Sequence, residues 1–221
     1  MDPNARPAIE IRQAFAYPLN DPAWPGKLGL GALFLLLCLL LVGIPIVLGY
    51  LRRLFLGAVQ DPQAPLPEWD PGADLRDGLP ATIVVAVYGL ASFLLMTLPI
   101  VGPFLALVPA FLLPAALTGL FALGPLSAAF DLPTMLEYMR DNLENYLLGV
   151  VLGVVVAAVS ALGLVALIVG VFFTTSWGMS VLTHAWAQVY RNSKLVTAHP
   201  VSVLPEPKVS VAAAPATQAS S

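Results

Sequence analysis

Long apolar stretches separated by short charged segments dominate the chain. Three stretches contain no Asp, Glu, Lys or Arg: residues 28–51, 78–130 and 145–190. A membrane-spanning helix needs about 20 predominantly apolar residues, because the hydrocarbon core is about 30 Å thick and a helix rises about 1.5 Å per residue. The three stretches therefore predict about one, two and two spans.

Breaks within these stretches divide them into five apolar segments. Pro99 and Pro103 mark a turn in the second stretch. The third stretch would measure about 69 Å as one helix of 46 residues, so it must break, and we place this turn at 170–176. The predicted segments are about 28–50, 79–98, 104–123, 147–169 and 172–190.

The first segment contains Gly43-Ile44-Pro45, where proline removes a helical hydrogen bond and predicts a kink or a break. Residues 28–50 then either span the membrane or return at this point as a re-entrant hairpin. We favour the re-entrant form, because it puts all ten Lys and Arg on one side. The C-terminus is then expected on the cytoplasmic side of a multi-pass protein of the cell membrane.

Amphipathic segments flank this bundle. Residues 131–146 place apolar side chains on one helical face and charged ones on the other, which predicts a helix in the plane of the membrane interface. Residues 1–27 are expected to form an N-terminal interfacial segment, with a short helix from Ala8 to Tyr17. Residues 195–221, rich in Pro, Val, Ala and Ser, are expected to be a disordered tail.

The fold class predicted is all-α: a polytopic transmembrane helical bundle over residues 28–194, with two helical hairpins, a broken or re-entrant first segment and interfacial amphipathic helices. Composition agrees, since 58% of residues are hydrophobic and 10% charged, against about 25% charged in soluble domains. The charged segments are too short to build a soluble core. The net charge of −3, with no basic block, excludes nucleic acid as a partner.

Several short motifs lie in the first 80 residues: Ala14-Phe15-Ala16-Tyr17-Pro18, Asp21-Pro22-Ala23-Trp24, Gly49-Tyr50, Leu66-Pro67-Glu68-Trp69-Asp70 and Asp77-Gly78. In these motifs the chain resembles an uncharacterised domain-of-unknown-function family of small prokaryotic polytopic membrane proteins. The resemblance implies a bacterial or archaeal cytoplasmic membrane protein with no established activity. The C-terminal half matches only in hydropathy.

One predicted span carries a stripe of polar side chains. They recur at three- and four-residue spacing and therefore share one helical face. This polar stripe consists of Ser176, Ser180, Thr183, His184 and Gln188. It either lines a solute path with His184 as a pH-sensitive element, or forms interhelical hydrogen bonds, or faces water on an interfacial helix. We favour the last two interpretations.

The preceding span carries a row of small residues at four-residue spacing: Gly149, Gly153, Ala157 and Ala161. Small residues let helix backbones approach closely. The row serves either packing within the chain or self-association, and the sequence leaves both open.

Candidate chemistry is sparse. The acidic segment with Glu68, Asp70, Asp74 and Asp77 fits a calcium loop poorly, because Pro71 interrupts it and no bidentate Glu ends it. Phosphate-binding loops, zinc-binding His motifs and nucleophile elbows have no counterpart in the sequence. We therefore expect neither a metal nor a cofactor, and no enzymatic activity.

The sequence favours a non-catalytic integral membrane protein, a structural, assembly or accessory subunit that contacts the lipid bilayer and either a membrane-protein partner or a second copy. The alternative is a small permease or channel for a neutral or lipidic solute that uses the polar stripe. The scarcity of acids and bases in the spans disfavours ion-coupled transport.

Overall fold

The structure, a computed structural model, describes residues 9–162 and 168–198. These residues form helices and turns with no strand, which confirms the predicted all-α bundle. Along the chain the elements are α1 (Ile11–Ala16), η1 (Tyr17–Asn20), α2 (Trp24–Leu37), η2 (Cys38–Leu40), α3 (Gly43–Gln60), α4 (Pro71–Met96), α5 (Gly102–Leu123), η3 (Leu126–Phe130), α6 (Leu132–Asp141), α7 (Leu143–Leu162), α8 (Ile168–Arg191) and α9 (Leu195–Ala198).

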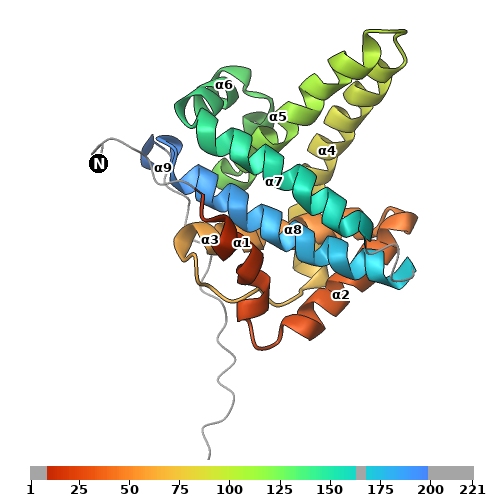
Figure 1. Ribbon diagram of the computed structural model, residues 1–221, viewed down its shortest axis with the longest axis vertical. Helices are drawn as coiled ribbons and strands as arrows, with labels where there is room; N and C mark the ends of the chain where they lie inside the picture. The colour runs from red at the N-terminus through yellow and green to blue at the C-terminus, as the bar shows by residue number, and fades with distance from the viewer. Residues whose placement is uncertain (1–8, 163–167, 199–221) are drawn as a thin grey trace, which may run out of the picture.

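Helix α8 lies at the centre of the molecule. It packs against α7 on one side and against α1, α2 and α3 on the other (Figure 1). Val181, Ala185 and Ala187 on α8 are completely buried. The last long helix of the described residues is therefore packed between elements from both ends of the sequence.

Three helices in the described part of the chain are long and apolar enough to cross a membrane: Pro71–Met96, Gly102–Leu123 and Leu143–Ala161. The bent pair Ile11–Asn20 and Trp24–Leu40, with 96° between its halves, adds a fourth if it counts as one span. Helix α8, which contains the predicted segment 172–190, is not among them. Its Ser, Thr, His and Gln side chains lower its hydropathy, and its C-terminal half is enclosed by protein.

The turn predicted at 170–176 is wrong, because these residues lie inside α8. The Thr174 hydroxyl donates to the carbonyl of Gly170 at 2.9 Å and also lies 3.1 Å from the carbonyl of Val171. A hydroxyl that bonds back to its own helix is accommodated there at a small cost in stability, and it often bends the helix without ending it. Helix α7 ends at Leu162 and α8 begins at Ile168, and residues 163–167 between them lie outside the described residues.

The first apolar segment is broken, but five residues earlier than Gly43-Ile44-Pro45 suggests. Helix α2 ends at Leu37 and the chain turns back through Cys38–Val42, where Leu41 has a φ of 64°. Pro45 is the third residue of α3, a position whose N–H has no helical acceptor, so it starts this helix instead of kinking it.

The amphipathic segment 131–146 also divides. Helix α6 ends at Asp141, and Asn142, with a φ of −139°, separates it from α7. In the segment predicted to be disordered, Leu195–Ala198 form α9, and the remainder of that segment lies outside the described residues.

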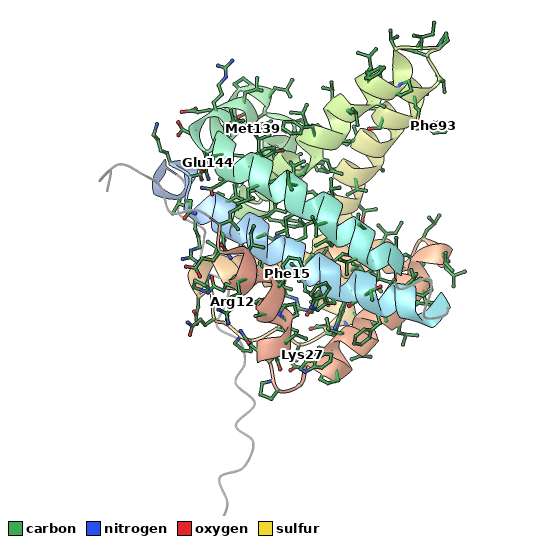
Figure 2. The ribbon with its side chains drawn as sticks, in the orientation of Figure 1. Arg12, Phe15, Lys27, Phe93, Met139 and Glu144 are labelled. Carbon is green, nitrogen blue, oxygen red and sulfur yellow. The ribbon has the colours of Figure 1, made fainter. Side chains whose placement is uncertain are left out.

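Helices α4 and α5 form a hairpin that projects from the rest of the molecule (Figure 1). Large apolar side chains along it are exposed, among them Phe93, labelled in Figure 2, at 67%. At its base α4 packs closely against α3.

Candidate functional site

The five residues of the polar stripe all lie on the buried face of α8. Ser176, Ser180, Thr183, His184 and Gln188 are each less than 10% exposed. The structure therefore brings them together on one face, as their spacing predicts. The segments opposite them are the N-terminal residues 9–20, here called the N-terminal segment, and the loop 61–70 between α3 and α4, here called the Trp69 loop.

His184 joins these segments through its two ring nitrogens. Nε2 lies 3.1 Å from the carbonyl oxygen of Pro62, and Nδ1 lies 3.2 Å from Nε2 of Gln188. A carbonyl only accepts, so Nε2 carries the proton and Nδ1 accepts from Gln188, which describes a neutral imidazole. The ring of Tyr17 stacks on this imidazole at a centroid distance of 4.1 Å.

Gln188 extends the same chain of hydrogen bonds to the N-terminal segment. Its Oε1 accepts from the backbone N–H of Glu10 at 2.8 Å. The Gln188 amide thus binds the N-terminal segment through its oxygen and His184 through its nitrogen. The arrangement is that of a packing contact between elements distant in sequence.

Two asparagines that the sequence did not single out complete this contact. Asn145 Oδ1 accepts from the backbone N–H of Ile9 at 3.0 Å, and Asn145 Nδ2 donates to Asn142 Oδ1 at 2.8 Å. Asn142 Nδ2 donates to the carbonyl of Val189 at 2.9 Å. The sequence offered one signal for these two residues: they are uncharged amides at the point where a charged segment meets an apolar stretch. An amide that is buried there needs hydrogen-bond partners.

Ser176 and Ser180 lie beside α2. The Ser180 hydroxyl donates to the carbonyl of Ser176 at 3.1 Å. A Cβ placed on Gly31 of α2 would lie 2.1 Å from the Ser176 hydroxyl oxygen, so a larger residue there would require this hydroxyl to move. Together with Tyr50 and Trp69 they line a cavity of about 10 Å³, room for about one water molecule.

Asp21 fastens the Trp69 loop to the start of α2. Its carboxylate accepts from the N–H of Ala23 at 2.7 Å, from Nζ of Lys27 at 2.9 Å and from the N–H of Leu66 at 2.9 Å. Burial alone would raise the pKa of Asp21, but the hydrogen bonds from Lys27 and these N–H groups outweigh it and hold that pKa below its usual value. Lys27 Nζ also lies 2.6 Å from the Leu66 carbonyl and 2.8 Å from Glu68.

Trp69 closes the loop onto the bundle. Its indole Nε1 donates to the carbonyl of Lys27 at 2.9 Å, and its ring stacks on Tyr50 at 3.8 Å with 6° between the planes. Phe34 packs against it at 4.8 Å. The side chain is half-buried in protein contacts.

The acidic side chains near this loop each have a different partner. Asp74 makes two hydrogen bonds with Arg53 at 2.8 and 2.7 Å, and Asp70 caps α4 by accepting from the N–H of Ala73 at 3.1 Å. Asp77 lies 3.7 Å from Arg52. Over the described ranges, no three Asp, Glu, His or Cys side chains converge on a point where a metal ion would bind.

Two glycines bring α3 and α4 into backbone contact beside the Arg53–Asp74 pair. A Cβ on Gly49 would lie 2.0 Å from the carbonyl oxygen of Asp74, and one on Gly78 would lie 1.8 Å from the carbonyl oxygen of Pro45. Three of the motifs behind the family resemblance, Gly49-Tyr50, 66–70 and Asp77-Gly78, thus converge on one interface.

The row of small residues on α7 divides between two environments. A Cβ on Gly149 would meet the Trp186 ring at 3.1 Å, and one on Gly153 would meet Leu182 at 3.7 Å. Ala157 and Ala161 are exposed. The first half of the row therefore packs against α8, and the second half faces away from the molecule.

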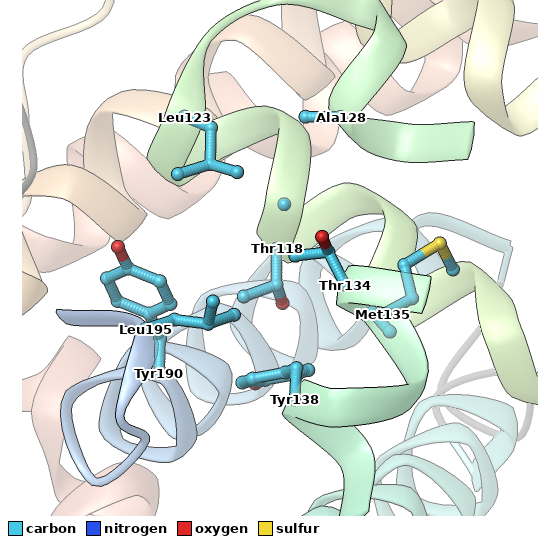
Figure 3. Close-up of a pocket in the computed structure, with 10 residues that line it drawn as sticks. Thr118, Leu123, Ala128, Thr134, Met135, Tyr138, Tyr190 and Leu195 are labelled. Carbon is cyan, nitrogen blue, oxygen red and sulfur yellow. The ribbon is translucent and has the colours of Figure 1, made fainter. Parts of the chain in front are cut away.

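A second small cavity lies between α5, α6 and the end of α8 (Figure 3). Thr118, Thr134, Tyr138 and Tyr190 line it together with apolar residues, and its volume is about 10 Å³. This is again room for about one water molecule.

Comparison with curated proteins and with solved structures found no match. A family model does match the region that contains α3, the Trp69 loop and α4, together with most of the first broken segment. It covers three of the five motifs quoted above. Residues 32–105 match the family described as "Protein of unknown function (DUF4013)", in agreement with the resemblance to an uncharacterised domain family.

Proposed function

We propose that this protein is a non-catalytic integral membrane protein, a structural, assembly or accessory subunit of the cell membrane with its C-terminus on the cytoplasmic side. Its apolar helices support a membrane setting, because they expose large aliphatic side chains where a soluble protein would place polar ones. Exposed examples on α2, α4, α5 and α7 are Leu33, Leu36, Ile83, Val87, Leu107, Val108, Val151 and Val154.

The main support for the proposal is that the polar stripe forms hydrogen bonds within the chain. His184 and Gln188 bind the carbonyl of Pro62 and the N–H of Glu10, groups that belong to other segments of the same chain. Such bonds stabilise tertiary packing in an apolar surrounding, where an unpaired polar group is costly. A solute path would need the same atoms to face the solute.

The partners we propose are the lipid bilayer and either a membrane protein or a second copy of the chain. Helix α6 supports a partner at the interface, because Leu132 and Leu136 are exposed on it while Met135, Tyr138 and Met139 are buried against the bundle. A helix with apolar side chains on two faces has one face left for lipid or protein.

The test separates a subunit from a permease. The purified protein is reconstituted into vesicles, and the flux of glycerol and the transbilayer movement of a fluorescent phosphatidylcholine are compared with protein-free vesicles. We expect no increase in either rate. In parallel, the tagged protein at its natural level is solubilised in mild detergent, and we expect it to elute with a membrane protein at fixed stoichiometry or as a homo-oligomer.

A matched pair of variants makes the outcome decisive. His184→Asn removes the imidazole, and Thr82→Ala removes a hydroxyl that bonds only within α4. Flux that exceeds the background in the wild type and in Thr82→Ala but disappears in folded His184→Asn would replace our proposal with the permease. A monomer without flux and without a partner would contradict the subunit role.

A further inference from the structure

Two hairpin turns in the described chain are uncharged, predominantly apolar and largely exposed. The α2–α3 turn consists of Cys38–Val42, and the α4–α5 turn consists of Thr97–Val101. Leu40 is 70% exposed and Ile100 is 89% exposed, and neither turn contains a charged residue, Trp or Tyr. A turn in water ordinarily carries polar residues. A turn at the membrane interface ordinarily carries Trp, Tyr, Lys or Arg. Neither turn therefore has the composition expected in water or at the interface.

Most backbone donors of the α4–α5 turn are satisfied within the hairpin. The N–H groups of Thr97, Leu98, Val101 and Gly102 donate to the carbonyls of Leu94, Leu95, Pro99 and Leu98 at 2.8 to 3.3 Å. Pro99 has no N–H, and the Thr97 hydroxyl bonds back to Leu94 at 2.7 Å. Internal satisfaction is what hydrocarbon requires of a backbone and what water does not.

The α2–α3 turn also forms backbone hydrogen bonds within the hairpin. The Leu41 N–H donates to the carbonyl of Cys38 at 2.9 Å, and the Ile44 N–H donates to that of Leu41 at 3.3 Å. The Cys38 thiol lies 3.4 Å from the carbonyl of Phe34. In both turns several backbone donors are thus paired within the hairpin, which suits an apolar surrounding.

The lengths of the uncharged arms set how deep each turn can reach. In α4 the uncharged part from Gly78 to Met96 is about 28 Å long, and in α2 the part from Leu28 to Leu37 is about 15 Å long. The hydrocarbon core is about 30 Å thick. The α4–α5 turn thus reaches no further than the far edge of the core, and the α2–α3 turn reaches about its middle.

We infer that both turns end among lipid acyl chains, so that the α2–α3 and α4–α5 hairpins enter the bilayer from one side and neither turn emerges into water on the other. This inference rests on the proposed membrane location. The exposed side chains at the turns contact lipid acyl chains. The charged residues before, between and after the two hairpins all lie on the side from which the hairpins enter. Figure 2 is consistent with this, with Arg12 and Glu144 far from Phe93.

The test uses single cysteines. Cys38→Ala removes the only native thiol, and Leu40→Cys, Ile100→Cys and a control, Gln63→Cys in the exposed part of the Trp69 loop, are added to it separately. Each protein is reconstituted in vesicles of phosphatidylcholine and phosphatidylglycerol that are opened by freeze–thaw so that both faces meet the reagent. A membrane-impermeant maleimide is then applied, and the labelling rate is measured.

We expect the cysteines at 40 and 100 to react at least about tenfold more slowly than the one at 63, because the charged reagent does not enter hydrocarbon. After denaturation in SDS all three should react equally. A nitroxide at either turn should collide often with oxygen and rarely with a water-soluble nickel chelate. Labelling of Ile100→Cys or Leu40→Cys as fast as Gln63→Cys overturns the inference for that turn.

Carbonate extraction separates this outcome from failure of the proposed function. A protein that alkaline carbonate releases from native membranes is not integral, and the proposed function fails with the inference. A protein that stays in the membrane while its turn reacts rapidly contradicts the inference alone. Since the Ile100 side chain is almost fully exposed, its replacement by cysteine should leave the fold intact.

Discussion

The α3–α4 and α7–α8 interfaces both bring helices together at glycines, but they differ in what the glycine meets. At α3–α4, Gly49 and Gly78 face backbone carbonyl oxygens, and the Arg53–Asp74 pair lies beside them. At α7–α8, Gly149 faces the ring of Trp186. Backbone cannot move without moving its helix, whereas a side chain can change its rotamer. The same residue type therefore implies strict glycine at one interface and tolerance at the other.

The largest effect is expected at Gly78. Gly78→Ala puts a methyl group 1.8 Å from the Pro45 carbonyl oxygen, and we expect a loss of about 3 kcal/mol or more, because overpacking against backbone forces the helices apart. Gly89→Ala is the matched control on the same helix, since nothing lies within 4 Å of that position. It should be neutral or stabilise by up to about 1 kcal/mol. Unfolding in mild detergent measures both, and equal midpoints for the two variants would contradict the close contact.

The buried ion pair at this interface ranks next. Asp74 is fully buried, so Asp74→Asn leaves Arg53 without its carboxylate, and we expect a cost of about 3 kcal/mol. Asp77→Asn is the control, because its contact with Arg52 is longer and partly exposed, and it should cost less than about 1 kcal/mol. If the two variants melt together, the pair does not stabilise the α3–α4 interface.

At the α7–α8 interface the expected cost is smaller. Gly149→Leu has to displace the Trp186 ring, which we expect to cost about 2 kcal/mol. Ala157→Leu lies in the same row of small residues but is exposed, so it should leave the midpoint unchanged in detergent. A loss of oligomer with Ala157→Leu but no change in the monomer would assign the exposed half of the row to self-association.

The sequence predicted where the helices lie along the chain better than it predicted which segments pack against each helix. The uncharged stretches located α4, α5 and α7 because hydropathy depends on local composition. Placing α8 at the centre required knowing which segments cover it, and these come from residues 9–20 and 61–70, far away in the chain. For the same reason the polar stripe was recognised while its partners Asn142 and Asn145 were not. Gly49 and Gly78 were noted only as motif residues, since a close contact between helices leaves no periodic pattern.

The smallest effect concerns how the Trp69 loop is held against the α3–α4 interface, and it depends on pH. The carboxylate of Asp21 has a pKa below its usual value, so its contribution to stability is complete above the pKa of the unfolded chain, about 3.9, and is lost as the pH falls through the lower pKa of the folded state. Asp21→Asn should therefore lower the free energy of unfolding by about 1 to 2 kcal/mol at pH 7, and the difference from wild type should shrink towards pH 2. Glu68→Gln, which alters an exposed carboxyl that also contacts Lys27, should change little at either pH. A difference between wild type and Asp21→Asn that stays constant over this range would mean that the side chain acts through its shape and not through its charge, and the loop would then be held by Trp69 and Tyr50 instead.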